Sequence, residues 1–385
     1  MDKPMRSGTI SLIYELRDTR TNMKYVLKVK RRGIERRLNE SIDNMNSLLH
    51  ILSFAMHLWV RIDVTDVVVR HFNLLRTQMD FKQEVANIIV AGNNMSNVDY
   101  IRVPHVYTGA CMCHGNAIIM EKLPGVHMSE VPTEDKNTFS DLAIKYFFVS
   151  SVIHHKFHGD LHAGNVLFID NGDNEYSDDD EPRFQLGIID FGIVVHFPEN
   201  ITETLFYIFE HQKDPEMTKC ITCSYLNNFL HPPNLLDRLP AAIVTLIVDD
   251  AADIARSVFL DGEMLEQVHF YRIFQCLCNN LSPEIISRME IKTSDGFIRF
   301  EVALSMCISL VSHLTDGDPN TQMKRVFDNM FHSDIMFSSR DEDDKLTLSD
   351  SSIKSTISED SICDDTSESD SSVPPLLPVY PDESL

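Results

Sequence analysis

Residues 155–170, HKFHGDLHAGNVLFID, place Asp160 and, five residues later, Asn165 among histidines just before an apolar run. Two chemistries use such a cluster. Imidazole and carboxylate groups bind zinc or iron in hydrolytic centres. An Asp followed by an Asn also suits a phosphotransferase loop, in which the Asp orients the acceptor hydroxyl and the Asn offers a neutral oxygen to a metal ion. The stretch alone leaves both chemistries open.

Three polar residues elsewhere in the chain favour phosphoryl transfer. Asp190, in IIDFG, follows an apolar run, so a buried strand there would carry its carboxylate to a position suited to a Mg²⁺ ion. Lys28, in YVLKVK, supplies a mobile positive charge for a phosphate oxygen. Glu84, in MDFKQEVAN, is the candidate carboxylate to hold that lysine. Each residue alone could be a turn, cap or solvated residue, but the set predicts a phosphotransferase site.

A histidine-rich metallohydrolase is the alternative. His154, His155, His158 and His162 are of the residue type that binds zinc or iron. Such an enzyme does not require a strand lysine, a helical glutamate and an Asp-Phe-Gly segment, and this chain has all three. We therefore expect His158 and His162 to pack and to form hydrogen bonds within the loop.

The pattern of apolar residues predicts the elements that position these side chains. Two alternating, β-branched runs in residues 8–30, separated by RDTRTNM, indicate a β-hairpin. Residues 34–91 have helical periodicity and no proline. The pattern then predicts strands over 100–109, 116–123, 165–170 and 184–192, and helices over 134–155 and most of 198–331. A strand-rich part is thus followed by a hinge near residues 120–125 and a helical part.

Composition restricts the class of protein. The chain has 385 residues, 43% of them hydrophobic, which is enough for one large two-lobed domain. A formal net charge of −24 without a basic stripe argues against nucleic acid as a partner. From Arg340 to the C-terminus, acidic residues outnumber basic ones by thirteen to three, so we expect residues 337–385 to form a disordered acidic tail.

The sequence also bears on the compartment. The N-terminus has no apolar signal core, and the strongest apolar candidate, residues 47–60, is too short to span a bilayer. Eight cysteines do not suggest a disulfide framework in a chain this long, although Cys220 and Cys223 have the spacing of a zinc half-site. We expect no transmembrane segment and an intracellular, reducing location in the cytoplasm, with an organelle as the alternative.

Seven segments together resemble one known family. In order they read GTISLIYEL, VLKVKRRGI, MDFKQEVAN, VPHVY, IIMEKLPGV, FHGDLHAGNVL and IIDFGIV. Their order and approximate spacing are similar to those of the UbiB family of atypical kinases, the aarF-domain kinases linked to coenzyme Q and isoprenoid-lipid metabolism. The resemblance covers roughly residues 6–335 by order of motifs. It is specific as a set, although no single motif would suffice.

The resemblance implies catalytic and metal-binding roles. Lys28 corresponds to the lysine that contacts the nucleotide, and Glu84 to its helical partner. Asp160 resembles the catalytic-loop aspartate. Asn165 and Asp190 resemble the metal ligands, and ATP with Mg²⁺ is the implied cofactor pair.

The resemblance also implies how the nucleotide is held. Met120 and Glu121 would lie at the hinge that contacts adenine, and Gly8, Thr9 and Ser11 in the loop over the phosphates. This loop reads Ser-Gly-Thr-Ile-Ser, whereas the family has an alanine-rich loop. The family also carries a helical extension with a Lys-x-Gly-Gln motif before this loop, and the expectation here is a minimal form without it.

We therefore predict an α+β, bilobal, protein-kinase-like fold. A small β-rich N-lobe with inserted helices would span residues 1–121, a larger helical C-lobe residues 122–336, and the tail residues 337–385. The predicted function is an atypical kinase or ATPase that uses ATP and Mg²⁺ and acts on a small, lipid-linked or protein acceptor. The alternatives are a nucleotide-binding pseudokinase adaptor and a small-molecule kinase similar to aminoglycoside and choline kinases. Peripheral membrane contact and protein partners of the tail stay open.

Overall fold

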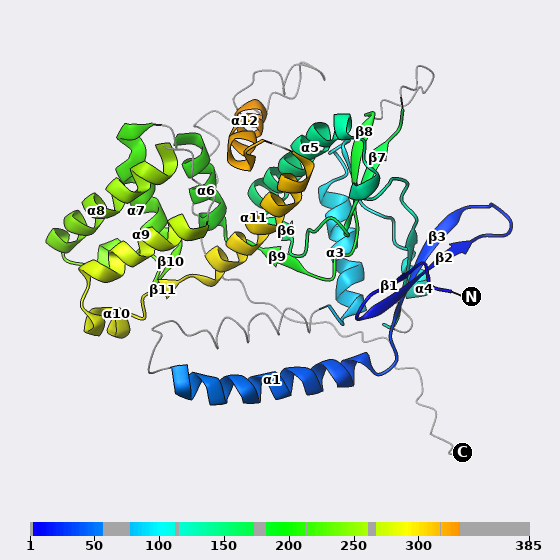
Figure 1. The fold of residues 1–385 in the computed structure, drawn as a ribbon, viewed down its shortest axis with the longest axis horizontal. Helices are drawn as coiled ribbons and strands as arrows, with labels where there is room; N and C mark the ends of the chain where they lie inside the picture. The colour runs from blue at the N-terminus through cyan, green and yellow to red at the C-terminus, as the bar shows by residue number, and fades with distance from the viewer. Residues whose placement is uncertain are drawn as a thin grey trace, which may run out of the picture. The chain divides into compact units, whose positions relative to one another are not determined.

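The computed structural model describes residues 3–56, 78–111, 115–172, 182–211, 214–260, 267–315 and 317–331. Two features expected from the sequence lie outside these ranges: the tail at 337–385 and the middle of the predicted helical stretch at 57–77. Within the described ranges the chain is an α+β protein in which helices predominate, as expected (Figure 1).

The described strands and helices follow the predicted order (Figure 1). The strands are β1 Arg6–Ser7, β2 Ser11–Arg17, β3 Lys24–Lys30, β4 Ile101–Arg102, β5 Ala117–Glu121, β6 Lys156–His158, β7 Val166–Asp170, β8 Phe184–Ile188, β9 Val194–His196, β10 Leu230–His231 and β11 Lys292–Thr293. The α-helices are α1 Ile34–Met56, α3 Phe81–Asn94, α4 Thr108–Cys111, α5 Lys136–Phe148, α6 Glu199–His211, α7 Thr218–Asn228, α8 Ala241–Leu260, α9 Gln267–Asn280, α10 Pro283–Met289, α11 Asp295–Leu314 and α12 Pro319–Phe331.

The N-terminal strands form an antiparallel sheet in the order β1-β2-β3-β5. The predicted hairpin is confirmed, with β2 and β3 paired along their whole length. In this register Lys28 lies opposite Ile13 on one side and Ile118 on the other. The lysine therefore occupies a central strand, where its backbone is fixed from both sides.

Two further groups of strands surround the loops that carry the candidate chemistry. β7 and β8 form an antiparallel hairpin, and β6 pairs with β9. Asn165 immediately precedes β7, whereas Asp190 follows β8 by two residues. Because Val166 pairs with Ile188, the hairpin brings these two residues to the same end.

The prediction of a strand over 100–109 is wrong for most of that run. Only Ile101 and Arg102 form a strand, which pairs in parallel with β8. Val106 makes a single bridge to Met120, and α4 then begins at Thr108. Pro104 lacks a backbone N–H, so it cannot donate to a continuous ladder.

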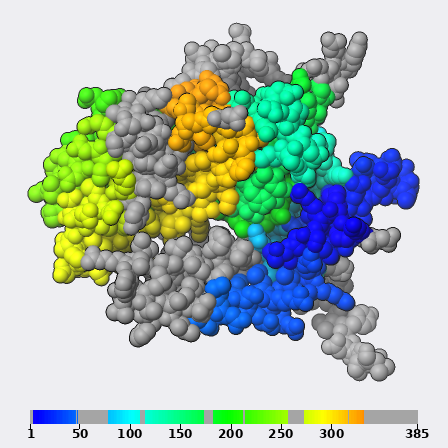
Figure 2. All heavy atoms as spheres, in the orientation of Figure 1, coloured from blue at the N-terminus to red at the C-terminus, as the bar shows by residue number. Residues whose placement is uncertain are grey.

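The helical part is built around α5 and α11, which pack against each other, and α12 also packs on α5. Figure 2 shows the surface of α12, in orange, bordering that of α5. The hydroxyl of Ser294 caps α11 by accepting from the N–H of Phe297. By length and composition alone α11 could cross a membrane, but its residues Phe300, Leu304 and Val311 belong to the buried core.

Gly125, which follows β5 in the segment between the two parts, has a backbone conformation that requires glycine. Its φ is +112°, and an added Cβ would lie 2.8 Å from the carbonyl oxygen of Phe168. We expect Gly125→Ala to lower the free energy of unfolding, measured in urea, by about 3 kcal/mol. Gly33→Ala is the control, because Gly33 has φ +68° but no atom near the added Cβ, and about 1 kcal/mol is expected. Equal losses would contradict the steric argument.

Candidate functional site

The structure brings Lys28 and Glu84 together across the N-terminal part. The carboxylate of Asp80 caps α3 by accepting from the backbone N–H groups of Lys82 and Gln83, and Glu84 follows within the first turn. The Nζ atom of Lys28 lies 2.7 Å from Oε1 of Glu84. Both side chains are buried, and the partnership predicted from the sequence is present.

Asp190 completes the arrangement from the helical part. Its Oδ1 atom lies 2.8 Å from Nζ of Lys28, so one ammonium bridges two carboxylates from distant segments. Asp190 has φ +65°, a left-handed conformation that is uncommon outside glycine. Such backbone conformations cost free energy and concentrate at functional sites, where surrounding contacts hold them in place.

Burial and charge act against each other on these three groups. Burial favours the neutral acid of Glu84 and so raises its pKa, and the nearby Asp190 carboxylate acts in the same direction. Together they outweigh the opposite effect of the Lys28 ammonium, and the pKa of Glu84 is about 7. The second oxygen of Glu84, Oε2, is buried without a hydrogen-bond partner among the described residues. Burial opposes ionisation of Asp190 too, but the Lys28 ammonium prevails and lowers the pKa of that carboxyl. Asp190 is therefore the ionised partner at neutral pH.

The loop that contains Asp160 is held by backbone and amide contacts. Gly159 donates to the carbonyl of Ile193, which fixes the loop to the segment before β9. The Nδ2 group of Asn165 donates to the backbone carbonyl of Asp160 at 2.9 Å. This leaves Oδ1 of Asn165 without a partner in the part of the chain that the structure describes. The amide oxygen is thus available as a ligand.

The histidines of the loop have structural contacts. His158 is buried, its Nε2 lies 3.0 Å from the carbonyl oxygen of Ile189, and its Nδ1 accepts from the backbone N–H of Asp160. His162 accepts from the N–H of Gly164, and His155 contacts the hydroxyl of Thr202.

These contacts favour the expectation that His158 and His162 stabilise the loop. Across the described ranges no group of three or more His, Cys, Asp or Glu side chains is arranged to hold a metal ion, and Cys220 and Cys223 are free thiols there. The geometry therefore gives the zinc alternative no support.

A cleft of about 390 Å³ opens onto the bridge formed by Lys28. Of the residues predicted to form the site, six line it: Lys28, Glu84, Met120, Glu121, Asn165 and Asp190. Apolar side chains that the sequence did not single out cover its walls: Met5, Ile13, Val26, Leu123, Leu167 and Ile189. A cleft with apolar walls and a few convergent polar groups is the usual form of a small-molecule site.

Four of the predicted residues do not line this cleft. Gly8, Thr9 and Ser11 lie in the turn between β1 and β2, where the N–H of Gly8 donates to the carbonyl of Ser11. Asp160 lies beside the cleft, within reach of the Asn165 amide. No observation tests the catalytic or nucleotide-contacting roles of the predicted site residues, which stay predictions.

Arg6 is a cleft residue that sequence reasoning missed. It belongs to the edge strand β1, and its Nη1 donates to the carbonyl of Gly164 at 3.2 Å. This contact joins the N-terminal sheet to the loop that carries Asn165. The only signal in the sequence was a cation two residues before Gly8, which periodicity does not distinguish from a solvated residue.

The hinge residues differ in what they present. Met120 is buried, whereas the side chain of Glu121 turns to Arg102, with Oε1 3.1 Å from Nη2. The backbone N–H of Glu121 donates to the carbonyl of His105. The carboxylate of Glu121 is therefore occupied by a neighbouring cation.

The donor set fits Mg²⁺. Asn165 and Asp190 offer an amide oxygen and an ionised carboxylate, both hard ligands of the kind that Mg²⁺ prefers alongside water and phosphate oxygens. The ammonium of Lys28 contacts Asp190 and would add positive charge for an anionic ligand beside the ion that these two residues would hold.

Comparisons with known proteins identify the family. A family model described as the ABC1 atypical kinase-like domain matches residues 1–224, more than half of the chain. A probable protein kinase UbiB from Haemophilus ducreyi is 31% identical over 147 residues, which cover 37% of this chain and 27% of the relative. A protein of the same description from Aeromonas salmonicida is 25% identical over 198 residues, covering 50% of this chain and 34% of the relative. The chain thus matches about a third or less of the length of these relatives.

A solved structure supports the fold. A Mycobacterium tuberculosis protein, solved as a complex with erythromycin, superposes with a TM-score of 0.52 over 86% of this chain and 77% of its own. Sequence identity is 17%, so the likeness concerns the fold alone. The expected α+β, kinase-like fold is confirmed.

Proposed function

This chain belongs to the ABC1 atypical kinase-like family, and on that premise we propose that it binds ATP with Mg²⁺ in the cleft and hydrolyses it or transfers its terminal phosphate. The observation that carries the proposal is the position of Lys28, whose ammonium joins Glu84 and Asp190 at the base of the cleft. Phosphoryl transfer depends mainly on positioning and on neutralising charge, and these are what the arrangement offers.

Each residue has a defined part in this proposal. Lys28 binds a phosphate oxygen, and Glu84 holds the ammonium in place from α3. Asn165 and Asp190 hold Mg²⁺, which when bound neutralises charge on the phosphate oxygens. Asp160 orients the acceptor hydroxyl or water, and its fixed position relative to Asn165 supports that role.

Asp190→Asn tests the proposal. The change removes the negative charge that holds the metal, so turnover of ATP with Mg²⁺ should fall by about 100-fold or more. The assay is phosphate release by purified protein, combined with thermal stabilisation by nucleotide, which reports binding by mass action.

Asp170→Asn is the matched control, because Asp170 ends β7 and pairs with the exposed Arg183 outside the cleft. Turnover in this control should stay near that of the wild type. If Asp190→Asn keeps full turnover, the assignment of the site is wrong. If the wild type binds nucleotide but does not turn it over, the pseudokinase adaptor is the better description.

We also propose that the acceptor is a small, lipid-linked or protein molecule and that the protein acts in a reducing intracellular compartment. The second part is supported by five free thiols among the described residues: Cys220, Cys223, Cys276, Cys278 and Cys307. Labelling of the acceptor with radioactive phosphate from ATP, in a mixture of candidate lipids and proteins, would identify its class.

A further inference from the structure

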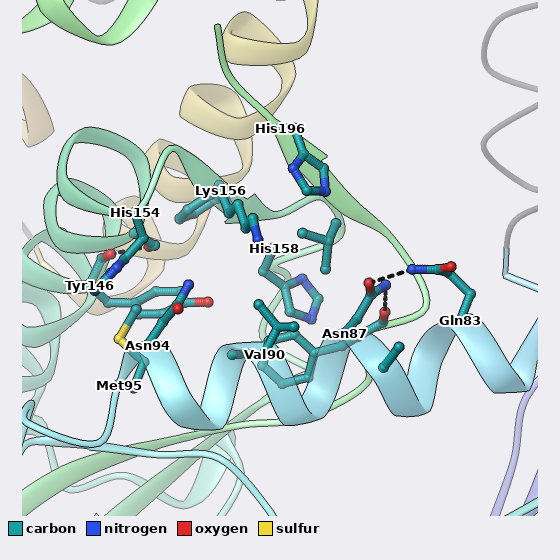
Figure 3. Close-up of a pocket in the computed structure, with 16 residues that line it drawn as sticks. Gln83, Asn87, Val90, Asn94, Met95, Tyr146, His154, Lys156, His158 and His196 are labelled. Atoms are coloured by element: carbon teal, nitrogen blue, oxygen red, sulfur yellow. Dashed lines mark hydrogen bonds between the residues drawn. The ribbon is translucent and has the colours of Figure 1, made fainter. Parts of the chain in front are cut away.

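A second cavity, of about 240 Å³, lies between α3, the C-terminal end of the α5 segment, and strands β6 and β9 (Figure 3). No residue that lines it also lines the cleft with Lys28. In Figure 3, Lys156, His158 and His196 lie across from Asn87 and Val90 of α3.

One lysine and three histidines line this cavity: Lys156, His154, His158 and His196. No described Asp or Glu lines it, although the carboxylates of Asp160 and Asp190 act on the buried ring of His158 from the loop side. This is unexpected in a chain with a formal net charge of −24. Within the ranges that the structure describes, no carboxylate pairs with the Lys156 ammonium. Lys156 is half-buried, and a half-buried cation without a counter-ion favours the binding of an anion.

Lys156 also acts on two histidines of the lining, His154 and His196. Burial lowers the pKa of His196, and Lys156 and Arg299 lower it further because they repel a second positive charge. Burial is also the main cause that lowers the pKa of His154, and the positive charges of His155 and Lys156 lower it further. A bound anion would raise the pKa of both histidines.

The rest of the lining is apolar or neutral. Ala86, Val90, Ala91 and Met95 contribute one wall from α3, and Phe157 contributes another. At about 30 Å³ for each water-sized group, the volume holds about eight such groups. The cavity therefore suits a ligand with a short apolar body and one anionic head.

We propose that this cavity binds a small amphiphilic anion, whose carboxylate or phosphate pairs with Lys156 and whose apolar body lies against α3. The site does not depend on phosphotransfer, since it shares no lining residue with the cleft. It goes beyond the proposed function, because a bound anion would be neither nucleotide nor acceptor.

The site is placed to affect the cleft. Asn87, which lines the cavity, donates through Nδ2 to the backbone carbonyl of Phe191, one residue after Asp190. The same helix carries Glu84, and the ring of Phe191 packs edge-on against His158. A ligand that orders α3 would thus change the affinity of the cleft for nucleotide. Thermodynamic linkage requires nucleotide to change the affinity of the cavity for its ligand by the same factor. This consequence rests on the proposed nucleotide binding.

The test uses sodium hexanoate and butyl phosphate as probes and hexanamide as a neutral match for hexanoate. Binding to the full chain without nucleotide is followed by ligand-observed NMR. Both anions should bind more tightly than hexanamide, and Lys156→Met should weaken them by about tenfold or more. Lys156→Arg should keep the affinity, because the charge is retained. The stronger of the two probes identifies the head group as carboxylate or phosphate.

Lys292→Met is the matched control, since Lys292 is exposed on β11 and does not line the cavity. This variant should bind both anions like the wild type. Equal affinities for hexanoate and hexanamide, or an unchanged affinity in Lys156→Met, would overturn the proposal. If hexanoate binds as expected but leaves the affinity for ATP unchanged, the site stands and its coupling to the cleft is wrong.

Discussion

Lys28→Met is expected to abolish nucleotide-dependent stabilisation and to lower the free energy of unfolding by about 3 to 5 kcal/mol. The change removes the ammonium that lies within 2.8 Å of both Glu84 and Asp190 and leaves two carboxylates facing each other. Urea unfolding measures the stability, and the shift of the melting temperature with Mg²⁺ and ATP measures binding.

The loss should depend on pH. Glu84 has a pKa of about 7 in the folded protein, far above its ordinary 4.5, and removing Lys28 raises it further. The folded variant then binds more protons than the unfolded chain above pH 4.5, so its free energy of unfolding falls as the pH rises. The difference from the wild type should therefore be larger at about pH 8 than at about pH 6.

Lys30→Met is the control for this prediction. Lys30 lies two residues further along β3. Its side chain is only 10% exposed and lies over the Phe81 ring, but its carboxylate partner, Glu35, is 59% exposed, so a loss of about 1 to 2 kcal/mol is expected. Water reaches this pair from the Glu35 side and screens it, which keeps its contribution below that of the buried Lys28 pair. If Lys30→Met lost nucleotide binding and Lys28→Met did not, the assignment of the lysine would have to move by two residues.

His158→Ala is expected to have the second-largest effect, a loss of about 2 to 5 kcal/mol in the free energy of unfolding and a large loss of ATP turnover. His158 joins the loop of Asp160 to the segment of Asp190, accepting from the N–H of Asp160 and donating to the carbonyl of Ile189. Burial lowers the pKa of His158, so the neutral ring can do both. Alanine would leave both backbone groups without their partner and remove the packing against Phe191.

His162→Ala is the matched control in the same loop. The His162 ring is exposed: its Nε2 lies 3.7 Å from Oδ2 of Asp160, and it accepts one hydrogen bond, at 2.9 Å from the N–H of Gly164 two residues away. We expect a loss of less than about 1 kcal/mol, because water can replace that bond. Unfolding in urea and phosphate release by both variants make the comparison. Similar losses for the two histidines would show that the loop is held by other contacts.

The spacing of apolar residues was a reliable guide to strands and helices that are determined by their own residues. Alternation over 8–30 predicted the hairpin of β2 and β3, and the apolar runs after Asn165 and before Asp190 predicted β7 and β8. Helical periodicity over 34–91 and 134–155 predicted that these stretches contain helices, but it did not predict that α3 begins at Phe81 or that α5 ends at Phe148. These elements follow from side-chain spacing, which a single segment contains in full.

The local pattern of apolar residues was a poor guide where the structure of a segment depends on a partner far along the chain. The run over 100–109 has strand-like residues, yet only Ile101 and Arg102 find a partner, in β8. Likewise, Arg6 lines the cleft, although periodicity did not single it out. The pairing of β4 with β8 and the contact of Arg6 with Gly164 both join segments that are far apart in the chain.

By itself, the sequence determined the residue types, their order and therefore the family to which the chain belongs. Only the tertiary structure decided that one ammonium bridges carboxylates 56 and 162 residues away. It also decided that Glu84 titrates near neutral pH and that Lys156 faces a cavity without a carboxylate among the described residues. These properties depend on burial and on distances between remote segments, and no local pattern of residues encodes either quantity.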